Sequence, residues 1–293
     1  MKLGIVLPNQ VPVGLDGRRM LDWARTADAA GFYGLATIDK PNYDGWDPLA
    51  TLTAVASVTR SARLATTILQ LPNRNAVQVA ERAAIVDVLS NGRLDLGVAV
   101  GGRKDDYEVY GVSERFHDRG RRFPDQVRTI RAFWDRARTS TPEHGEPGPA
   151  PVQDPPPIWV GGMTEQTIAR AIQIGDGFMF GTRGAAGMGE LTPSIRERAA
   201  AIGKQNFPVI GLAYCAAGEG DDVLDRGAAA IVRYYGRLWA PPEQMILHGP
   251  AARILEGVKA YEGTGIDALY LWPQLNDLSQ VEMLAEGVLP AFS

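Results

Sequence analysis

Cysteine, histidine and long apolar runs are all scarce in this sequence. Cys215 is the only cysteine, which excludes an intrachain disulfide and a cluster of thiolate metal ligands. The three histidines, His117, His144 and His248, are scattered without the spacing of a metal site. No apolar stretch approaches the ~18 residues from which a membrane-spanning helix is recognised. We therefore expect neither a metal-dependent hydrolase nor a membrane protein.

The chain carries no large excess of charge of either sign. Its 30 lysines and arginines oppose 34 aspartates and glutamates, for a formal net charge of −4. Such a balance gives no general attraction to nucleic acid or to a membrane surface. Residues 1–5, MKLGI, lead directly into an apolar segment and lack the pattern of a signal peptide. These features predict a cytoplasmic protein whose partner is a small molecule.

Strand-like and helix-like segments alternate from end to end of the chain. Eight short apolar segments have the character of buried strands, and each is followed by helical spacing of apolar residues. The strands are expected at residues 3–7, 33–38, 63–69, 94–100, 158–160, 177–180, 209–215 and 268–272. Eight such units predict an α/β fold, the (β/α)8 TIM barrel. A doubly wound open sheet is the alternative, but neither Gly-x-Gly-x-x-Gly after the first strand nor a Walker loop is present.

The length of the chain suits a single barrel. Barrels of this kind take ~250 residues, so we expect one domain over residues 1–293 with short insertion segments. Residues 139–157 are rich in Pro and Gly and are predicted to form a loop, although a linker between two domains is the alternative. Helices are expected at residues 124–137 and 193–204, and a cationic loop after Gly101-Gly102.

Two glycine pairs follow expected strands, at the face where barrel enzymes place their active sites. Gly101-Gly102 follows the fourth strand, and Gly161-Gly162 precedes Met163, Thr164 and a helix. Bare backbone allows a flat or phosphorylated ligand to approach closely. The free N–H groups of the helix could hold a phosphate, to which Thr164 would add a hydroxyl. Ordinary turns, and an N-cap role for Thr164, are the alternatives.

Cations also occur near these strand ends. Arg103, Lys104 and Arg183 could neutralise phosphates, although solvated surface charge is the alternative for each. The expected strand ends carry few acids and no metal-binding triad. The whole set therefore suits a planar anionic cofactor better than a divalent metal. The segments at 42–46 and 183–188 are candidate substrate walls, with Tyr43 and Trp46 available for stacking or simply for packing.

Several short motifs recur in order over most of the chain. They are Asn91-Gly92-Arg93, Leu96 to Gly101, Tyr107 to Gly111, Arg119-Gly120-Arg121-Arg122, Pro156 to Gly162 and Gly175-Asp176-Gly177. In this order the sequence resembles the bacterial luciferase-like monooxygenase family of flavin- and F420-dependent oxidoreductases. The resemblance implies a (β/α)8 barrel, coenzyme F420 or FMN as cofactor, and a homodimer.

The resemblance also implies roles for residues after the second and third strands. Relatives often have a non-prolyl cis peptide behind the middle ring of the cofactor, and the matching bond here is Thr67–Ile68. The pair Asp39-Lys40 matches a polar pair, in many relatives Asp-His, near the reactive edge. Lysine in place of histidine could stabilise a deprotonated flavin or a substrate oxyanion, or act as an acid. A rim charge for Lys40 and a capping role for Asp39 are the alternatives.

These expectations lead to one preferred function and two alternatives. The preferred one is an F420-dependent oxidoreductase that transfers a hydride between the deazaflavin C5 and a small organic substrate. The brevity of residues 139–157 and the cationic residues near the strand ends favour it. The first alternative is an FMNH2-dependent monooxygenase with a separate reductase, which must shield its intermediate from water. The second is a non-catalytic flavin-binding protein.

Overall fold

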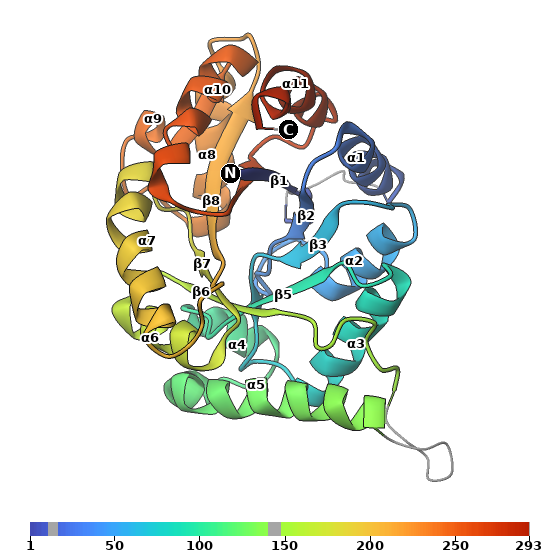
Figure 1. The fold of residues 1–293 in the computed structure, drawn as a ribbon. Coiled ribbons are helices and arrows are strands. Elements are labelled where there is room, and N and C mark those ends of the chain that lie inside the picture. Colours follow the sequence, from blue (N-terminus) through green and yellow to red (C-terminus); the bar gives the residue numbers. More distant parts are fainter. Residues whose placement is uncertain (11–16, 140–147, 293) are drawn as a thin grey trace.

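The computed structural model describes residues 1–10, 17–139 and 148–292. Parallel strands form a closed barrel, and helices surround it (Figure 1). The barrel strands are β1 (Lys2–Val6), β2 (Gly34–Thr37), β3 (Arg63–Thr66), β5 (Leu94–Ala99), β6 (Ile158–Gly162), β7 (Gly177–Phe180), β8 (Val209–Ala217) and β10 (Ala268–Pro273). Consecutive barrel strands pair along the chain, and β10 closes the ring by pairing with both β8 and β1. The predicted α/β (β/α)8 barrel is confirmed.

Three of the described helices begin at a capping side chain. The helices are α1 (Gly17–Ala30), α2 (Pro48–Ala56), α3 (Ala76–Leu89), α4 (Lys104–Val109), α5 (Arg115–Thr139), α6 (Glu165–Ile174), α7 (Ala185–Ala200), α8 (Val223–Tyr235), α9 (Pro242–Met245), α10 (Ala251–Lys259) and α11 (Ser279–Gly287). Asp47, Asn75 and Thr164 cap α2, α3 and α6, because each side chain accepts a hydrogen bond from a backbone N–H of the first turn.

Some predicted elements differ from the structure. The strand predicted at residues 63–69 is divided into β3 and a short β4 (Leu69–Gln70). The strand β9 (Ile246–Gly249) was not expected, and α4 occupies part of the segment predicted as a cationic loop. Helices α5 and α7 each begin about two turns before the prolines that the prediction placed at their first turns, Pro124 and Pro193. Residues 140–147 of the predicted loop, with His144, lie outside the described residues.

The two misplaced helix starts have a common physical reason. A proline inside a helix loses one backbone hydrogen bond, and its ring crowds the carbonyl four residues earlier. That earlier residue is Gly120 in α5 and Gly189 in α7. A glycine backbone adjusts more easily than any other, so each helix continues through its proline.

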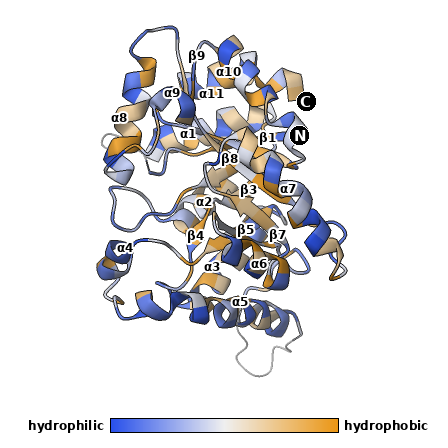
Figure 2. Ribbon diagram, turned by 90° about the vertical axis from the view of Figure 1, so that its left-hand side faces the viewer, coloured by the Kyte–Doolittle hydropathy of each residue, from blue (hydrophilic) through white to orange (hydrophobic). Residues whose placement is uncertain are grey.

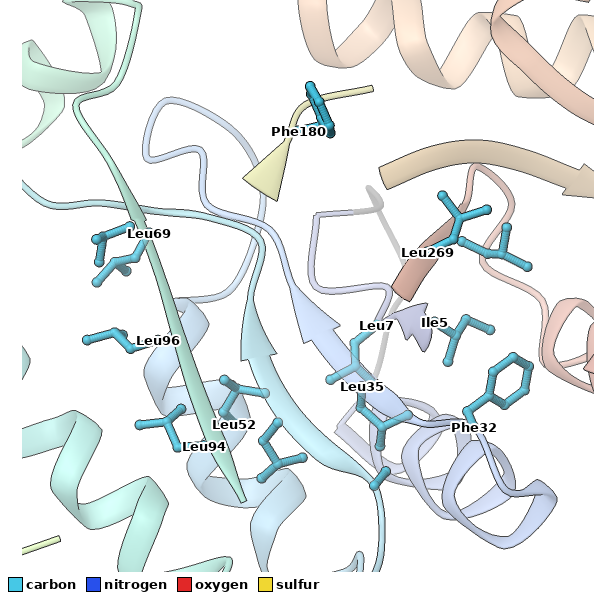
Figure 3. Packing of buried hydrophobic residues seen from close by; sticks show 14 of the residues in the cluster. Ile5, Leu7, Phe32, Leu35, Leu52, Leu69, Leu94, Leu96, Phe180 and Leu269 are labelled. Carbon is cyan, nitrogen blue, oxygen red and sulfur yellow. The ribbon is translucent and has the colours of Figure 1, made fainter. Parts of the chain in front are cut away.

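Apolar side chains fill two layers, one inside the barrel and one between the barrel and the helices. Along β8, Ile210, Leu212 and Tyr214 belong to the inner cluster, whereas Ala213 and Cys215 belong to the outer one. This alternation is the two-residue period of a strand. Figure 3 shows part of the outer layer, on β1, β2 and β5 among other elements. Figure 2 shows that apolar residues concentrate on the strands, whereas α5 is largely polar.

The amino-terminal end of the barrel is closed by a large ring placed over small residues. A Cβ atom on Gly4 or Gly34 would lie 2.4 or 2.3 Å from atoms of the Tyr270 side chain, so only glycine fits at these two positions. Arg63 and Asp95 form an ion pair between β3 and β5 at the same end. Ligands must therefore enter from the opposite end, where the strands finish.

Candidate active site

A cleft of about 1030 Å³ lies where β5 and β6 end. It is lined by Ile68, Ala99, Val100, Gly101, Gly102, His117, Asp118, Arg119, Gly120, Arg121, Gly161, Gly162, Met163, Thr164, Gln166, Thr167 and Arg170. The predicted residues Ile68, Gly101, Gly102, Gly161, Gly162, Met163 and Thr164 are thus brought together. Thr67, Arg103, Arg183, Asp39 and Lys40 do not line this cleft. The volume is at the upper end of the range of about 300–1,000 Å³ for cofactor and drug-sized sites.

One wall of the cleft is a bulge between β3 and β4. Ala65 pairs with Asp95, and the next pairing along these strands joins Leu69 to Val98. Three residues therefore lie between the pairs on one side and two on the other, which defines a bulge. The Thr67–Ile68 peptide within it is cis, as the family resemblance implied.

Glycines on the neighbouring strands make room for this bulge. A Cβ atom on Gly97 would lie 2.0 Å from the carbonyl oxygen of Thr66, and one on Gly161 would lie 2.8 Å from Cγ2 of Ile68. Ile68 thus rests on bare backbone and faces the cleft. The hydroxyl of Thr67 instead donates a hydrogen bond to a carbonyl of β2 at 3.2 Å, so this residue supports the bulge from behind.

The floor of the cleft is open backbone next to a helix amino terminus. A Cβ atom on Gly102 would have no atom within 4 Å, so no side chain covers the end of β5 there. Thr164 is the N-cap of α6, and its hydroxyl accepts a hydrogen bond from the N–H of Thr167 at 3.2 Å. The first N–H groups of a helix lack partners inside it and carry partial positive charge. Thr164 thus caps α6 and also lines the cleft.

Arg170 was not predicted, and it adds a cation to this end of the cleft. It makes no hydrogen bond or ion pair with any described residue, and its Cζ lies 5.7 Å from the ring centroid of Phe123. Burial lowers the pKa of Arg170, which is the effect expected for a cation without a counter-ion. Thr164, Thr167 and Arg170 are spaced by three residues, so helical periodicity would have placed them on one face.

The beginning of α5 contributes further cations, which in the sequence form part of the motif Arg119-Gly120-Arg121-Arg122. Arg119 donates a hydrogen bond from Nε to the carbonyl of Gly101 at 3.1 Å and stacks on Phe116 at 3.9 Å. It therefore fixes the turn after β5. Arg121 is exposed at the rim and pairs with Asp118 at 3.2 Å. Both residues reach the cleft because α5 begins at residue 115, which the sequence analysis missed.

Asp39 is held in a buried ion pair. Its two carboxylate oxygens accept hydrogen bonds from Nη1 and Nη2 of Arg74 at 2.6 and 3.0 Å. One of them also accepts from the backbone N–H of Gln70 at 2.7 Å. The Asp39 and Arg74 side chains are 2% and 8% exposed, so both charges depend on each other. Asp39 consequently joins the end of β2 to the segment that follows the bulge.

Lys40 is a buried cation surrounded by aromatic rings. Its ammonium donates a hydrogen bond to the carbonyl of Tyr234 and lies 4.7 and 4.5 Å from the ring centroids of Tyr43 and Tyr234. No carboxylate of a described residue is within ion-pair distance of it. Burial lowers the pKa of Lys40, the Arg103 guanidinium lowers it further, and nearby aspartates act in the opposite direction. The carbonyl of Tyr234 belongs to the last turn of α8, where a cation is favoured.

Two predicted cofactor ligands lie elsewhere. Arg103 precedes α4 and pairs with Asp105 at 3.4 Å on the surface. Arg183 lines a second cavity, of about 190 Å³, together with Tyr214 and Trp239. Within the described parts of the chain, no group of three or more metal-ligating side chains could hold a metal ion. No helix among those parts is both long and apolar enough to cross a membrane.

The fold and the cleft define an α/β-barrel protein with an anion-attracting site at the carboxyl ends of its strands, where barrel enzymes have their active sites. The chain belongs to the luciferase-like monooxygenase family, whose model matches residues 1–268. The resemblance seen in the sequence motifs is confirmed. The predicted enzyme class, an oxidoreductase, is confirmed with it.

The sequence identity between this chain and individual relatives is low. The chain is 23% identical to the oxygenase component of the flavin-dependent trigonelline monooxygenase of Acinetobacter baylyi, over 94% of this chain and 89% of that protein. An F420-dependent secondary alcohol dehydrogenase, solved with an F420–acetone adduct, has a TM-score of 0.78 at 16% identity and covers 100% of this chain and 99% of its own. The monooxygenase RslO1 of Streptomyces bottropensis has a TM-score of 0.79 at 20% identity and covers 100% of both chains. These structural likenesses show the fold.

Proposed function

We propose that this chain is an F420-dependent oxidoreductase that transfers a hydride between the deazaflavin C5 and a small organic substrate. The observation that carries the proposal is the guanidinium of Arg170, which has no polar partner among the described residues and lies beside the amino terminus of α6, at an open floor of glycine backbone. This donor set fits a phosphodiester. Arg121 continues the positive charge to the rim, where the acidic tail of F420 would leave the cleft.

The chain would bind and orient the cofactor, and the bound deazaflavin would supply the hydride chemistry. Ile68, on the bulge, would support the ring system, and Gly101-Gly102 would allow its close approach. Thr164 and Arg170 would hold the phosphate. Thr67 would act indirectly, by holding the bulge against β2.

Asp39 and Lys40 remain candidates for the reaction, and their contacts support positioning roles. Asp39 has both oxygens committed to Arg74 and Gln70, so we propose that it fixes the segment that carries the bulge. Lys40 joins the end of β2 to the end of α8, so we propose that it places the aromatic rings of Tyr43 and Tyr234 on the substrate side. Arg103 would contribute charge at long range only.

An FMN-dependent monooxygenase is the second candidate. The trigonelline monooxygenase component, which matches nearly the whole chain, is named as flavin-dependent, and this favours it. The same cleft residues would then hold the phosphate of FMN, and a separate reductase would supply the reduced cofactor. In either case we propose a homodimer that acts on a small molecule.

Parallel binding titrations separate the two candidates. Oxidised F420 and FMN are titrated separately into the purified protein, with fluorescence and calorimetry as readouts. We expect F420 to bind at least about tenfold more tightly than FMN, because only F420 can also use the cations at the rim. Selective binding of FMN would establish the monooxygenase candidate instead. Binding of neither cofactor would contradict both.

A further inference from the structure

The cavity that contains Arg183 lies apart from the cofactor cleft and has its own polar floor. It occupies about 190 Å³ beyond the ends of β7 and β8, against the segment that joins α8 to β9. Its lining includes Thr182, Arg183, Tyr214, Trp239 and Glu243. Tyr214 is 1% exposed, whereas Trp239 is 50% exposed, so the cavity has a buried floor and an open rim.

Two donors in this cavity lack a well-aligned acceptor among the described residues. The Arg183 guanidinium makes no hydrogen bond or ion pair with any residue that the structure describes. The Tyr214 hydroxyl is buried near Thr182 and Tyr235, yet it makes no hydrogen bond that meets ordinary geometry. Burial raises the pKa of Tyr214 well above 10, so this hydroxyl keeps its proton and can donate. A buried donor without an acceptor is costly, which points to a ligand.

The stem of Arg183 is placed by the backbone of α7. A Cβ atom on Gly187 would lie 2.9 Å from Cδ and Cγ of Arg183, so the aliphatic stem rests on bare backbone. This contact positions the aliphatic stem of Arg183 without a counter-ion. A site held in this way is ready to receive an anion.

This cavity lies next to the cofactor cleft. Met163 lines the cleft, and its Cγ and Sδ atoms lie 3.2 Å from where a Cβ atom of Gly181 would be. Thr182 and Arg183 follow Gly181 directly and line the second cavity. The end of β7 thus has the cofactor cleft on one side and the second cavity on the other.

We propose that this second cavity is a binding site for a small monocarboxylate, which it holds through Arg183 and Tyr214. Charge-assisted hydrogen bonds from a guanidinium and a hydroxyl match the two oxygens of a carboxylate.

The other lining residues restrict the ligand further. The volume is below the range of about 300–1,000 Å³ for drug-sized ligands, so it accepts one ring or a short chain. The rings of Tyr214 and Trp239, with centroids 6.2 Å apart, provide an apolar wall for such a body. The exposed carboxylate of Glu243 at the rim disfavours a second negative charge on the ligand. Hence a monocarboxylate is preferred over a dicarboxylate.

Benzoate and its neutral isostere benzamide test the proposal directly. Each is titrated into the cofactor-loaded protein, and binding is followed by ligand-observed NMR and calorimetry. We expect benzoate to bind about tenfold or more tightly than benzamide. Arg183→Gln should abolish this preference, Tyr214→Phe should weaken benzoate several-fold, and Arg183→Lys should keep part of it. Arg237→Gln, on the exposed surface outside the cavity, is the matched control and should change nothing.

The outcomes are distinguishable from a failure of the proposed function. Equal binding of benzoate and benzamide, or benzoate binding that survives Arg183→Gln, would overturn the proposal. So would an Arg183→Gln protein that loses cofactor affinity while still binding benzoate, since Arg183 would then serve the cofactor. If neither F420 nor FMN binds, the proposed function fails, and the benzoate preference of the cofactor-free chain still decides the carboxylate site.

Discussion

Single residues at the strand ends differ chiefly in whether their charges have partners. Asp39 and Arg74 neutralise each other in a buried pair. Lys40 has only a carbonyl oxygen and two ring faces. Arg170 and Arg183 have no polar partner among the described residues and line cavities. Residues of the first kind hold the site together, whereas the last two are available to ligands.

The Asp39–Arg74 pair should contribute strongly to stability. Asp39→Asn removes the buried one of two carboxylates that pair with Arg74, the other being the partly exposed Asp47 at 3.6 Å. We expect a loss of about 3 kcal/mol in the free energy of unfolding, measured in urea. Asp22→Asn is the control, because Asp22 pairs with Arg25 on the exposed surface. That change should cost under about 1 kcal/mol. Equal losses for the two substitutions would show that the buried pair contributes no more to stability than the exposed pair does.

Lys40 should make stability depend on pH in a defined direction. Burial lowers its pKa in the folded chain from the ordinary 10.5, so below the folded pKa the folded state bears the full cost of the buried charge. As pH rises through the folded pKa towards 10.5, Lys40 loses its proton in the folded chain before it does in the unfolded chain. The free energy of unfolding therefore increases over this interval. The free energy of unfolding of the wild type, relative to Lys40→Met, should therefore rise between pH 7 and about pH 10.

An exposed lysine provides the comparison for that experiment. Lys259→Met, at the end of α10, should give a difference from the wild type that stays flat over the same pH interval. The difference in the free energy of unfolding between the wild type and Lys40→Met could instead be flat, or fall with pH. Either result would mean that the ammonium is at least as well stabilised in the fold as in water.

At the level of elements, the bulge after β3 is the feature that shapes the cleft. The sequence shows a continuous apolar strand at residues 63–69, and the structure divides it into β3, the bulge and β4. Nothing in the apolar pattern marks that break; only the family resemblance pointed to Thr67–Ile68. The glycine at position 97 makes the arrangement sterically possible from the neighbouring strand.

Gly97→Ala should therefore disturb the bulge. A Cβ atom there would lie 2.0 Å from a backbone oxygen, which cannot move as a flexible side chain would. We expect a loss of about 2–3 kcal/mol in stability and weaker cofactor binding, measured by thermal unfolding and by titration. Gly263→Ala, whose Cβ atom would meet nothing within 4 Å, should be almost neutral. Unchanged cofactor affinity in Gly97→Ala would mean that the bulge does not support the ring.

For the molecule as a whole, the sequence predicted the barrel well and the site only in part. Eight buried apolar strands can be recognised locally, because strand periodicity is a short-range property. The glycine pairs could be recognised for the same reason. Arg121 could not, since its place in the cleft depends on where α5 starts. Arg170 could have been indicated by its spacing from Thr164 and Thr167 on one face of α6. Arg183 was correctly expected at a strand end, but the sequence cannot show that β7 separates two cavities.

The central claim is that Arg170 and the amino terminus of α6 hold the phosphate of the cofactor. The most direct measurement compares the affinity of wild type and Arg170→Gln for intact F420 and for its deazaflavin chromophore without the phosphate-bearing tail. We predict that the substitution weakens F420 about tenfold or more and leaves the tailless chromophore unchanged, with Arg128→Gln on the exposed face of α5 as a silent control. Equal weakening of both ligands, or of neither, would contradict the claim.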